Sequence, residues 1–336
     1  MQPVFIIAEA GVNHNGSLDL ALSLIDAAKA AGADAVKFQT FRADNLATAT
    51  AHKAAYQERT TSNEETQFQM LKRLELDAEA HERLIEHCRT VGIQFLSSPF
   101  DIESADLLEQ MDVPLYKIPS GEITNLPYLR HIGRKGKPVI LSTGMSTLVE
   151  VEEGVQALRE SGGKDITLLH CVTEYPAPFD EINLRAMHTL HTAFGLPVGY
   201  SDHTPGTEIA IAAVALGAVV IEKHFTLDRN LPGPDHAASL EPSELKQMVS
   251  AIRHVESALG NGIKTPAKCE IPNMSVARKS LVASRTLQAG HKLEPDDLAI
   301  KRPGNGIAPR QQPDLIGRTL RCDVQKDDLL RWDHLA

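Results

Sequence analysis

The stretches LPVGYSDHT (residues 196–204) and VVIEKHFT (residues 219–226) show the pattern that decides the fold. In each, a short apolar run, Val198–Tyr200 or Val219–Ile221, ends in polar residues that are capable of chemistry. A helix-like stretch separates the two runs. Continuous apolar runs of this length are typical of strands buried on both faces, as in parallel sheets. The two stretches therefore predict a strand–helix–strand unit with reactive groups at the ends of its strands.

The same pattern occurs six more times toward the N-terminus. Helix signals lie between the runs, such as the capping box that opens at Thr147 and the helix 242–259 that Gly260 stops. Eight alternations over about 260 residues predict a (β/α)₈ TIM barrel. The rival fold, a doubly wound open sheet, usually carries a Gly-x-Gly-x-x-Gly motif after its first strand, and this sequence has none. The six further runs are Val4–Ala8, Ala35–Phe38, Ile93–Leu96, Leu115–Ile118, Val139–Leu141 and Ile166–Leu169.

Active sites of this fold lie at the C-terminal ends of the strands, so polar groups are expected to gather there. Every predicted strand ends in such groups, which predicts one site at the mouth of the barrel. In chain order they include Glu9, Lys37, Gln39, Ser97, Ser98, Lys117, Ser120, Glu122, Ser142, Thr173, Tyr175, Ser201, His203, Glu222 and His224.

His203 and His224 end neighbouring strands. Two imidazoles on rigid strands can hold a divalent metal and leave coordination positions open for a substrate carbonyl or a water. The alternative is that each histidine is an ordinary polar group at the rim.

Lys37 and Lys117 end the second and fourth strands. A lysine at a barrel mouth is either a Schiff-base nucleophile or an anion clamp. The hydroxyls of Ser120, Ser142 and Ser201 favour a cradle for phosphate or carboxylate. Pairing of each lysine with a rim carboxylate is the plainer alternative.

The sequence is compatible with two roles for each of several further residues. Glu9 and Glu122 could accept hydrogen bonds from sugar hydroxyls or form rim ion pairs. Tyr175 could wall a sugar site or merely turn the chain. Arg302, in a basic turn-rich loop, could reach an active site or be a solvated surface charge.

Composition indicates a second, smaller domain. The chain has 336 residues and a formal net charge of -10, which argues against broad nucleic-acid binding. Residues 278–336 nevertheless carry 11 Lys and Arg against 8 Asp and Glu. We expect a barrel domain at 1–262, a linker at 263–277 and a small domain at 278–336. The sequence contains no apolar stretch of about 20 residues, so it predicts no membrane span. The four cysteines are widely spaced, as is typical of proteins in a reducing cytosol.

Together the motifs resemble the sialic acid synthase family, and 278–336 resembles that family's antifreeze-like SAF domain. The resemblance rests on EAGVNHNG (9–16), VKFQT (36–40), KIPSGE (117–122), LSTGMS (141–146), HCVTEYP (170–176), YSDHT (200–204) and EKHFT (222–226).

The resemblance implies a cytoplasmic enzyme that condenses phosphoenolpyruvate with an N-acetylmannosamine-type sugar and releases phosphate by C–O cleavage. It implies a divalent metal, usually Mn²⁺ with Mg²⁺ or Co²⁺ as alternatives, and a domain-swapped homodimer. Glu222, Lys37 and Lys117 would be catalytic, and His203 and His224 would hold the metal. Phosphoenolpyruvate would contact Lys37, Lys117, Ser120, Ser142, Thr173 and Ser201, although some members carry Asn at the position of Thr173. The amino sugar would contact Glu9, Gln39, Glu122, Tyr175, Asp235 and Arg302, the last from the SAF domain of a partner.

The motifs leave the sugar open. The main expectation is N-acetylneuraminate synthase, and the alternative is a synthase of N,N'-diacetyllegionaminate acting on 2,4-diacetamido-2,4,6-trideoxy-mannose. Two other classes remain: a Schiff-base aldolase using Lys37 or Lys117, and a non-catalytic ice-binding role of the small domain. Flat threonine arrays would support ice binding, and residues 278–336 hold only Thr286 and Thr319.

Overall fold

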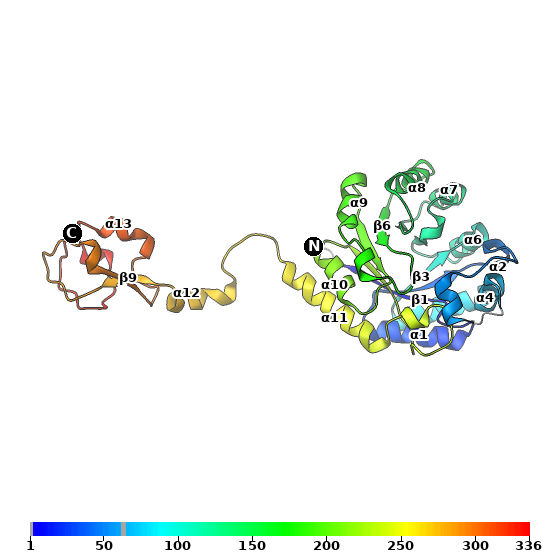
Figure 1. Ribbon diagram of the computed structural model, residues 1–336, viewed down its shortest axis with the longest axis horizontal. Coiled ribbons are helices and arrows are strands. Elements are labelled where there is room, and N and C mark those ends of the chain that lie inside the picture. Colours follow the sequence, from blue (N-terminus) through cyan, green and yellow to red (C-terminus); the bar gives the residue numbers. More distant parts are fainter. Residues whose placement is uncertain (1–2, 62–64) are drawn as a thin grey trace. The chain divides into compact units, whose positions relative to one another are not determined.

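The computed structural model describes residues 3–61 and 65–336, and the chain divides into two compact units, Met1–Gly260 and Asn261–Ala336. In the first unit eight parallel strands form one sheet in the order β3-β2-β1-β8-β7-β6-β5-β4. The end strands β3 and β4 lie side by side and close the ring (Figure 1). This confirms the predicted barrel. The strands are β1 (Phe5–Gly11), β2 (Ala35–Thr40), β3 (Gln94–Pro99), β4 (Tyr116–Ile118), β5 (Val139–Ser142), β6 (Ile166–Cys171), β7 (Val198–Asp202) and β8 (Val220–His224).

The helices that cover the barrel begin and end at the residues that the sequence marks. The Ser17 hydroxyl accepts from the Leu20 amide at the start of α1, and Asp77 caps α5 in the same way. The capping box of Thr147 and Glu150 opens α8. The covering helices are α1 (Leu18–Ala31), α5 (Ala78–Val91), α6 (Ile102–Gln110), α7 (Leu126–Arg134), α8 (Leu148–Glu160), α9 (Ala186–Phe194), α10 (Glu208–Ala215) and α11 (Pro242–Leu259).

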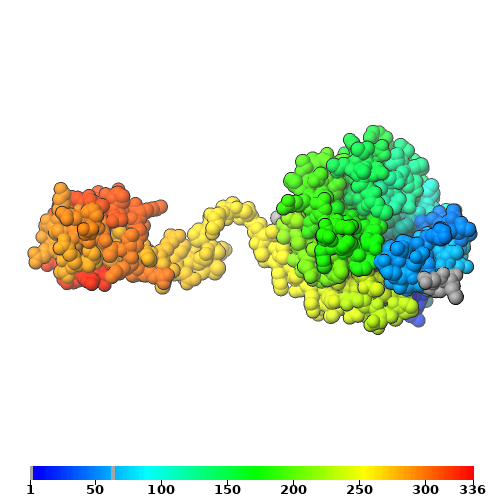
Figure 2. All heavy atoms as spheres, viewed as in Figure 1, coloured from blue at the N-terminus to red at the C-terminus, as the bar shows by residue number. Residues whose placement is uncertain are grey.

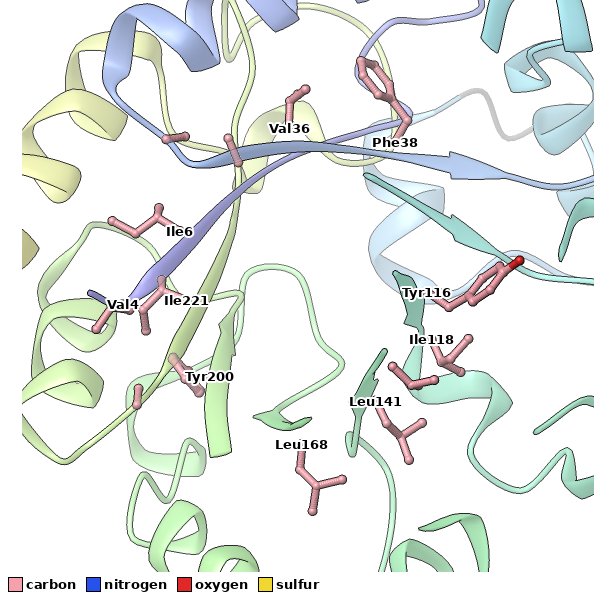
Figure 3. Packing of buried hydrophobic residues seen from close by; sticks show 14 of the residues in the cluster. Val4, Ile6, Val36, Phe38, Tyr116, Ile118, Leu141, Leu168, Tyr200 and Ile221 are labelled. Carbon is pink, nitrogen blue, oxygen red and sulfur yellow. The ribbon is translucent and has the colours of Figure 1, made fainter. Parts of the chain in front are cut away.

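Side chains alternate between the two faces of each strand and so build two apolar layers. The outward residues, such as Ile6 on β1 and Val36 on β2, pack toward the helices (Figure 3). The inward residues fill the lower part of the barrel: Ile7, Ala35, Leu96, Ile140, Leu169 and Val220. The next inward position along each strand is polar or reactive, as with Glu9 above Ile7. The same alternation that builds the core therefore turns the reactive groups into the barrel mouth.

One inward position of β7 requires glycine. A Cβ added to Gly199 would lie 2.3 Å from the carbonyl oxygen of Val220 and 2.7 Å from Leu169 Cδ2. Neighbouring backbone and core leave no room for a side chain there.

The segment between β2 and α5 carries three further helices, α2 (Ala43–Leu46), α3 (Ala55–Thr60) and α4 (Gln67–Leu74). None of them is among the predicted elements, because α2 and α3 are single turns without an apolar period. In α4, Met70 and Leu74 are buried against Val12 and Phe41. In Figure 2 this segment, coloured blue, lies on the surface of the barrel unit.

The second unit is built around the antiparallel pair of β9 (Ser280–Ala283) and β10 (Leu298–Lys301). Its own apolar cluster includes Leu281, Leu293 and Leu330. The expected linker contains a short helix, α12 (Ile271–Ala277), and α13 (Gln312–Leu315) lies further along the chain.

A buried carboxylate ties this small unit together. Asp297 accepts hydrogen bonds from Arg285 at 2.8 Å, from His291 at 2.7 Å and from the Glu294 amide at 2.9 Å. Burial of Asp297 opposes its ionisation, but these bonds outweigh burial and lower its pKa to about 2. The carboxylate therefore contributes most when it is ionised.

Candidate active site

The polar strand ends line one cavity of about 380 Å³ at the mouth of the barrel. Ser97 is an exception among the predicted strand-end groups, because it faces outward and its hydroxyl lies 2.6 Å from that of Thr40. All of the residues in 1–260 to which a role is assigned lie at the walls of the cavity, and these roles stay predictions. They are Glu9, Lys37, Gln39, Lys117, Ser120, Glu122, Ser142, Thr173, Tyr175, Ser201, His203, Glu222, His224 and Asp235.

Two lysines and two glutamates form a buried charge network at the floor of this cavity. Lys37 Nζ lies 2.7 Å from Glu9 Oε2 and 3.7 Å from Glu222 Oε2. Lys117 Nζ lies 3.4 Å from Glu222 Oε1, to which Ser201 also donates at 2.9 Å. The sheet register brings the groups together, because Glu9 and Lys37 are partners on β1 and β2. The four charges balance one another away from water.

The environment separates the pKa values of the two glutamates. Burial raises the pKa of Glu9 to about 7, although Lys37 opposes the rise. Burial also opposes ionisation of Glu222, but Lys117 and Lys37 outweigh it and lower the pKa of Glu222. Burial lowers the pKa of Lys117, whereas the two carboxylates raise that of Lys37. Carboxyl groups with separated pKa values can take different parts in proton transfer.

Hydroxyl groups stand beside Lys117 on the far wall. The Ser120 hydroxyl accepts from the Gly144 amide at 2.9 Å. Ser142 Oγ and Thr173 Oγ1 are buried and have no hydrogen-bond partner among the described residues. Buried polar atoms are nearly always hydrogen-bonded, so these hydroxyls suit a ligand that supplies acceptors. A lysine in a cavity that also holds two unpaired hydroxyls is suited to phosphate or carboxylate.

Gly144 is essential to the shape of this wall. An added Cβ would lie 2.4 Å from Thr173 Oγ1 and 2.8 Å from Ser120 Oγ. Any larger residue would displace the hydroxyls from the cavity.

The two predicted metal ligands face each other across the cavity. The rings of His203 and His224 are 5.5 Å apart at their centroids. His203 Nδ1 lies 2.6 Å from the Val172 carbonyl oxygen, which leaves Nε2 for a ligand. His224 Nδ1 is buried without a hydrogen-bond partner. Burial lowers the pKa of both imidazoles, and neutral imidazoles are metal ligands.

The donor set fits a metal only if other groups complete it. Within residues 3–61 and 65–336 no group of three or more His, Cys, Asp or Glu is arranged to hold a metal ion. Two histidines alone would leave the remaining positions to substrate oxygens or water, as in catalytic rather than structural sites.

A buried ion pair lies behind the histidines, on the outward face of β7 and β8. Lys223 Nζ donates to Asp202 Oδ2 at 2.8 Å and to the Thr204 carbonyl. Asp202 Oδ1 accepts from the Thr204 amide at 2.9 Å, the Thr204 hydroxyl at 2.8 Å and the Tyr200 hydroxyl at 3.3 Å. Because Asp202 precedes His203 and Lys223 precedes His224, this pair joins the strands that carry both imidazoles.

Aromatic rings close one side of the cavity. Tyr175 lies 4.2 Å from His203 and 4.9 Å from Tyr56, measured between ring centroids. Tyr56 is on α3 and is absent from the predicted site, because nothing in its local sequence marks it.

The carboxyl group of Asp235 also lies at the cavity. Its Oδ2 is 3.8 Å from His224 Nδ1, and burial raises the Asp235 pKa to about 6.

Three further residues are predicted to contact the sugar. Gln39 donates to Glu9 Oε1 at 3.3 Å, and Glu122 accepts from Asn125 at 2.7 Å at the rim. Arg302 belongs to the second unit, where its Nε donates to the Ala277 carbonyl at 3.0 Å. Its contact with a sugar stays a prediction.

The fold and the site define a class: a (β/α)₈ barrel with buried lysines, carboxyl groups and histidines gathered at its mouth, where enzymes of this fold have their active sites. Residues 24–264 match the NeuB family, and residues 278–336 match the SAF domain. The chain therefore belongs to the NeuB family, which confirms the resemblance that its motifs indicate.

Three similar proteins support the assignment. The chain is 53% identical to an N,N'-diacetyllegionaminic acid synthase of Campylobacter jejuni, over 98% of this chain and 100% of the relative. It is 48% identical to the Legionella pneumophila enzyme of the same name, over 98% and 94%. The crystal structure of an N-acetylneuraminic acid synthetase from Leptospira borgpetersenii matches with a TM-score of 0.72 at 37% identity, covering 81% of this chain and 90% of that one. Among the described helices, none has the length and apolar character needed to span a membrane.

Proposed function

We propose that this chain is an N,N'-diacetyllegionaminic acid synthase, which condenses phosphoenolpyruvate with 2,4-diacetamido-2,4,6-trideoxy-mannose and releases phosphate. The observation that carries the reaction is the cavity in which two buried lysines and free hydroxyls meet a histidine pair. The higher identity to the two legionaminic acid synthases than to the N-acetylneuraminic acid synthetase favours the trideoxy sugar over N-acetylmannosamine.

Different residues of the site take different parts in the proposed reaction. Lys117 and Lys37 hold the anionic groups of phosphoenolpyruvate, and Ser120, Ser142 and Thr173 donate to its oxygens. The enol carbon attacks the aldehyde carbon of the open-chain sugar, forming the new C–C bond. Water adds to the carbon that bore the phosphate ester, and the C–O bond to phosphate breaks. The electron pair of the aldehyde C=O bond moves onto its oxygen, which becomes a hydroxyl. Glu222 takes one proton from the water and passes it to that oxygen, and the second proton leaves with phosphate as the carbonyl of the product forms. The lysines stabilise the developing negative charge.

His203 and His224 would hold a divalent cation, which we propose is Mn²⁺. When bound, such an ion supplies Lewis-acid polarisation of a carbonyl oxygen. Replacement of either histidine by Gln should abolish binding of Mn²⁺, measured from the electron paramagnetic resonance signal of the free ion. The melting temperature of the barrel should stay the same. Unchanged Mn²⁺ affinity in both variants would refute the assignment.

The reaction is tested by phosphate release from phosphoenolpyruvate with Mn²⁺ and each of two acceptors, N-acetylmannosamine and its 2,4-diacetamido-trideoxy analogue. We expect a higher kcat/KM for the analogue, with one phosphate released per condensed product. Preference for N-acetylmannosamine would make the protein an N-acetylneuraminate synthase with the same site. Release with neither acceptor would refute the proposed reaction.

A Schiff-base aldolase is the second candidate, and the lowered pKa of Lys117 favours it. Glu222, 3.4 Å away, favours the protonated amine instead. Borohydride treatment in the presence of substrate should leave the mass of the protein unchanged. A covalent adduct on Lys117 would establish the aldolase.

Three further points are proposed on the resemblance: the exact domain bounds, with a linker at 263–277, a domain-swapped homodimer, and a cytoplasmic location.

Arg302 would bind the N-acetyl group of the sugar in a partner's barrel. Arg302→Ala should raise KM for the sugar without changing KM for phosphoenolpyruvate, and equal KM values for the sugar would refute the role.

A further inference from the structure

The outer wall of the cavity differs in chemistry from its floor. Residues 43–61 and 65–74, between β2 and α5, supply this wall, which we call the α2–α4 wall. Among these described residues, the side chains at the cavity are apolar, aromatic or amide, and none is charged: Leu46, Tyr56, Gln57, Gln67, Met70, Leu71 and Leu74. Val12 and Phe100 continue the apolar surface. One cavity thus joins a charged floor to an apolar wall.

Packing holds this wall in place. Met70 and Leu74 are buried and pack with Val12 and Phe41, and the half-buried Leu46 and Leu71 pack against that cluster. The capping box of Thr66 and Gln69 begins α4 at a defined residue.

Contacts to the rest of the rim fix α3 over the site. The Thr60 hydroxyl lies 3.3 Å from the Pro234 carbonyl oxygen, in the loop after β8, and shares its one proton between this oxygen and two carbonyl oxygens of its own helix. Arg59 pairs with Glu174 at 3.4 Å, next to Tyr175, whose ring contacts that of Tyr56. The α2–α4 wall is therefore a built part of the cavity rather than a loose loop.

We infer that the α2–α4 wall selects the acceptor by its end remote from the aldehyde, favouring a methyl and an acetamido group over hydroxyls. This inference rests on the proposed function. The charged floor and the histidines fix the reacting aldehyde, so the rest of the sugar chain extends toward the wall. A C6 methyl group fits against Leu46 and Leu71, whereas a hydroxymethyl group would lose its hydrogen bonds to water there. The amides of Gln57 and Gln67 can donate to and accept from an acetamido group.

The discriminating variant is Leu71→Gln, which keeps the size of a half-buried side chain and adds a polar end. Leu71→Met is the matched control, because it keeps the wall apolar at similar volume. In the wild type we expect kcat/KM to favour the trideoxy acceptor over N-acetylmannosamine. Leu71→Gln should reduce that ratio about tenfold, the lower range for one methylene in an apolar pocket. Leu71→Met should keep it, and KM for phosphoenolpyruvate should stay constant in both.

Leu46→Gln, on a different helix, repeats the test in case Leu71→Gln does not fold. An unchanged acceptor ratio in the folded Gln variants would overturn the inference while phosphate release by the wild type upheld the reaction. A loss of the ratio caused only by a higher KM for phosphoenolpyruvate would also overturn it. If the wild type used neither acceptor, the proposed function would fail first and the inference with it.

Discussion

The buried pair of Asp202 and Lys223 should respond unequally to loss of either partner. Asp202→Asn leaves the Lys223 ammonium buried with one firm acceptor, the Thr204 carbonyl, and we expect a cost of about 3–5 kcal/mol in the free energy of unfolding. Lys223→Met leaves Asp202 with its three donors from Thr204 and Tyr200 and replaces a buried ammonium by an apolar chain. We expect about 1–3 kcal/mol for that change.

The assay is urea unfolding followed by far-ultraviolet circular dichroism, which reports mainly on the helices around the barrel. The only tryptophan of the chain, Trp332, lies in the second unit, so its fluorescence provides an internal reference that neither variant should shift. Lys72→Met removes the surface pairs with Asp44 and Glu75 and serves as the control, with little change expected. An equal or larger loss for Lys223→Met than for Asp202→Asn would refute this account of the pair.

The same pair should affect the histidines that follow its members in sequence. Asp202→Asn should weaken Mn²⁺ binding by about tenfold through the position of His203, as supporting residues of metal ligands usually do. Unaltered affinity in a folded variant would show that β7 and β8 hold His203 and His224 without the pair.

Three further predictions concern single positions. Gly199→Ala should prevent stable folding of the barrel or cost several kcal/mol, because the new Cβ would meet the Val220 carbonyl at 2.3 Å; a normal melting temperature would contradict this. Gly144→Ala should raise KM for phosphoenolpyruvate while KM for the sugar changes little, since the Cβ displaces Thr173, and the reverse pattern would place the anion elsewhere. The Asp297 carboxylate, with its pKa lowered from 3.8 to about 2, stabilises the second unit above pH 3.8, and that contribution disappears as pH falls toward 2. Trp332 fluorescence should show the loss, Asp297→Asn should flatten it, and an equally steep loss in that variant would refute it.

The barrel could be predicted from the sequence because its strands are apolar on both faces and its helices carry local caps. The predicted strand Val219–Ile221 continues to His224 in the structure, and Val198–Tyr200 continues to Asp202. Strand ends were underestimated at these points because the last residues of each strand are polar, so hydrophobicity does not mark them. The inward-facing ones of these polar residues line the floor of the cavity, although the roles assigned to them stay predictions.

The α2–α4 wall could not be predicted in the same way. Tyr56 and Leu71 reach the cavity only through tertiary packing, by contact with Tyr175 and with the cluster around Met70. Short helices of low intrinsic stability take their shape from the surface they cover, and no local pattern records that surface. The pairing of Asp202 with Lys223 likewise depends on the register of β7 and β8 rather than on either local sequence.

The position of the α2–α4 wall has a consequence for how such an enzyme can change over evolutionary time. The groups proposed for bond making stand on the strands of a closed ring, where few substitutions are tolerated. The wall belongs to the segment between β2 and α5, whose described residues contribute no strand to the ring. Substitutions in this segment could therefore change which acceptor sugar is used without altering the groups proposed for bond making. A mutant library confined to residues 43–74 would be a compact starting point for engineering the use of other acceptor sugars.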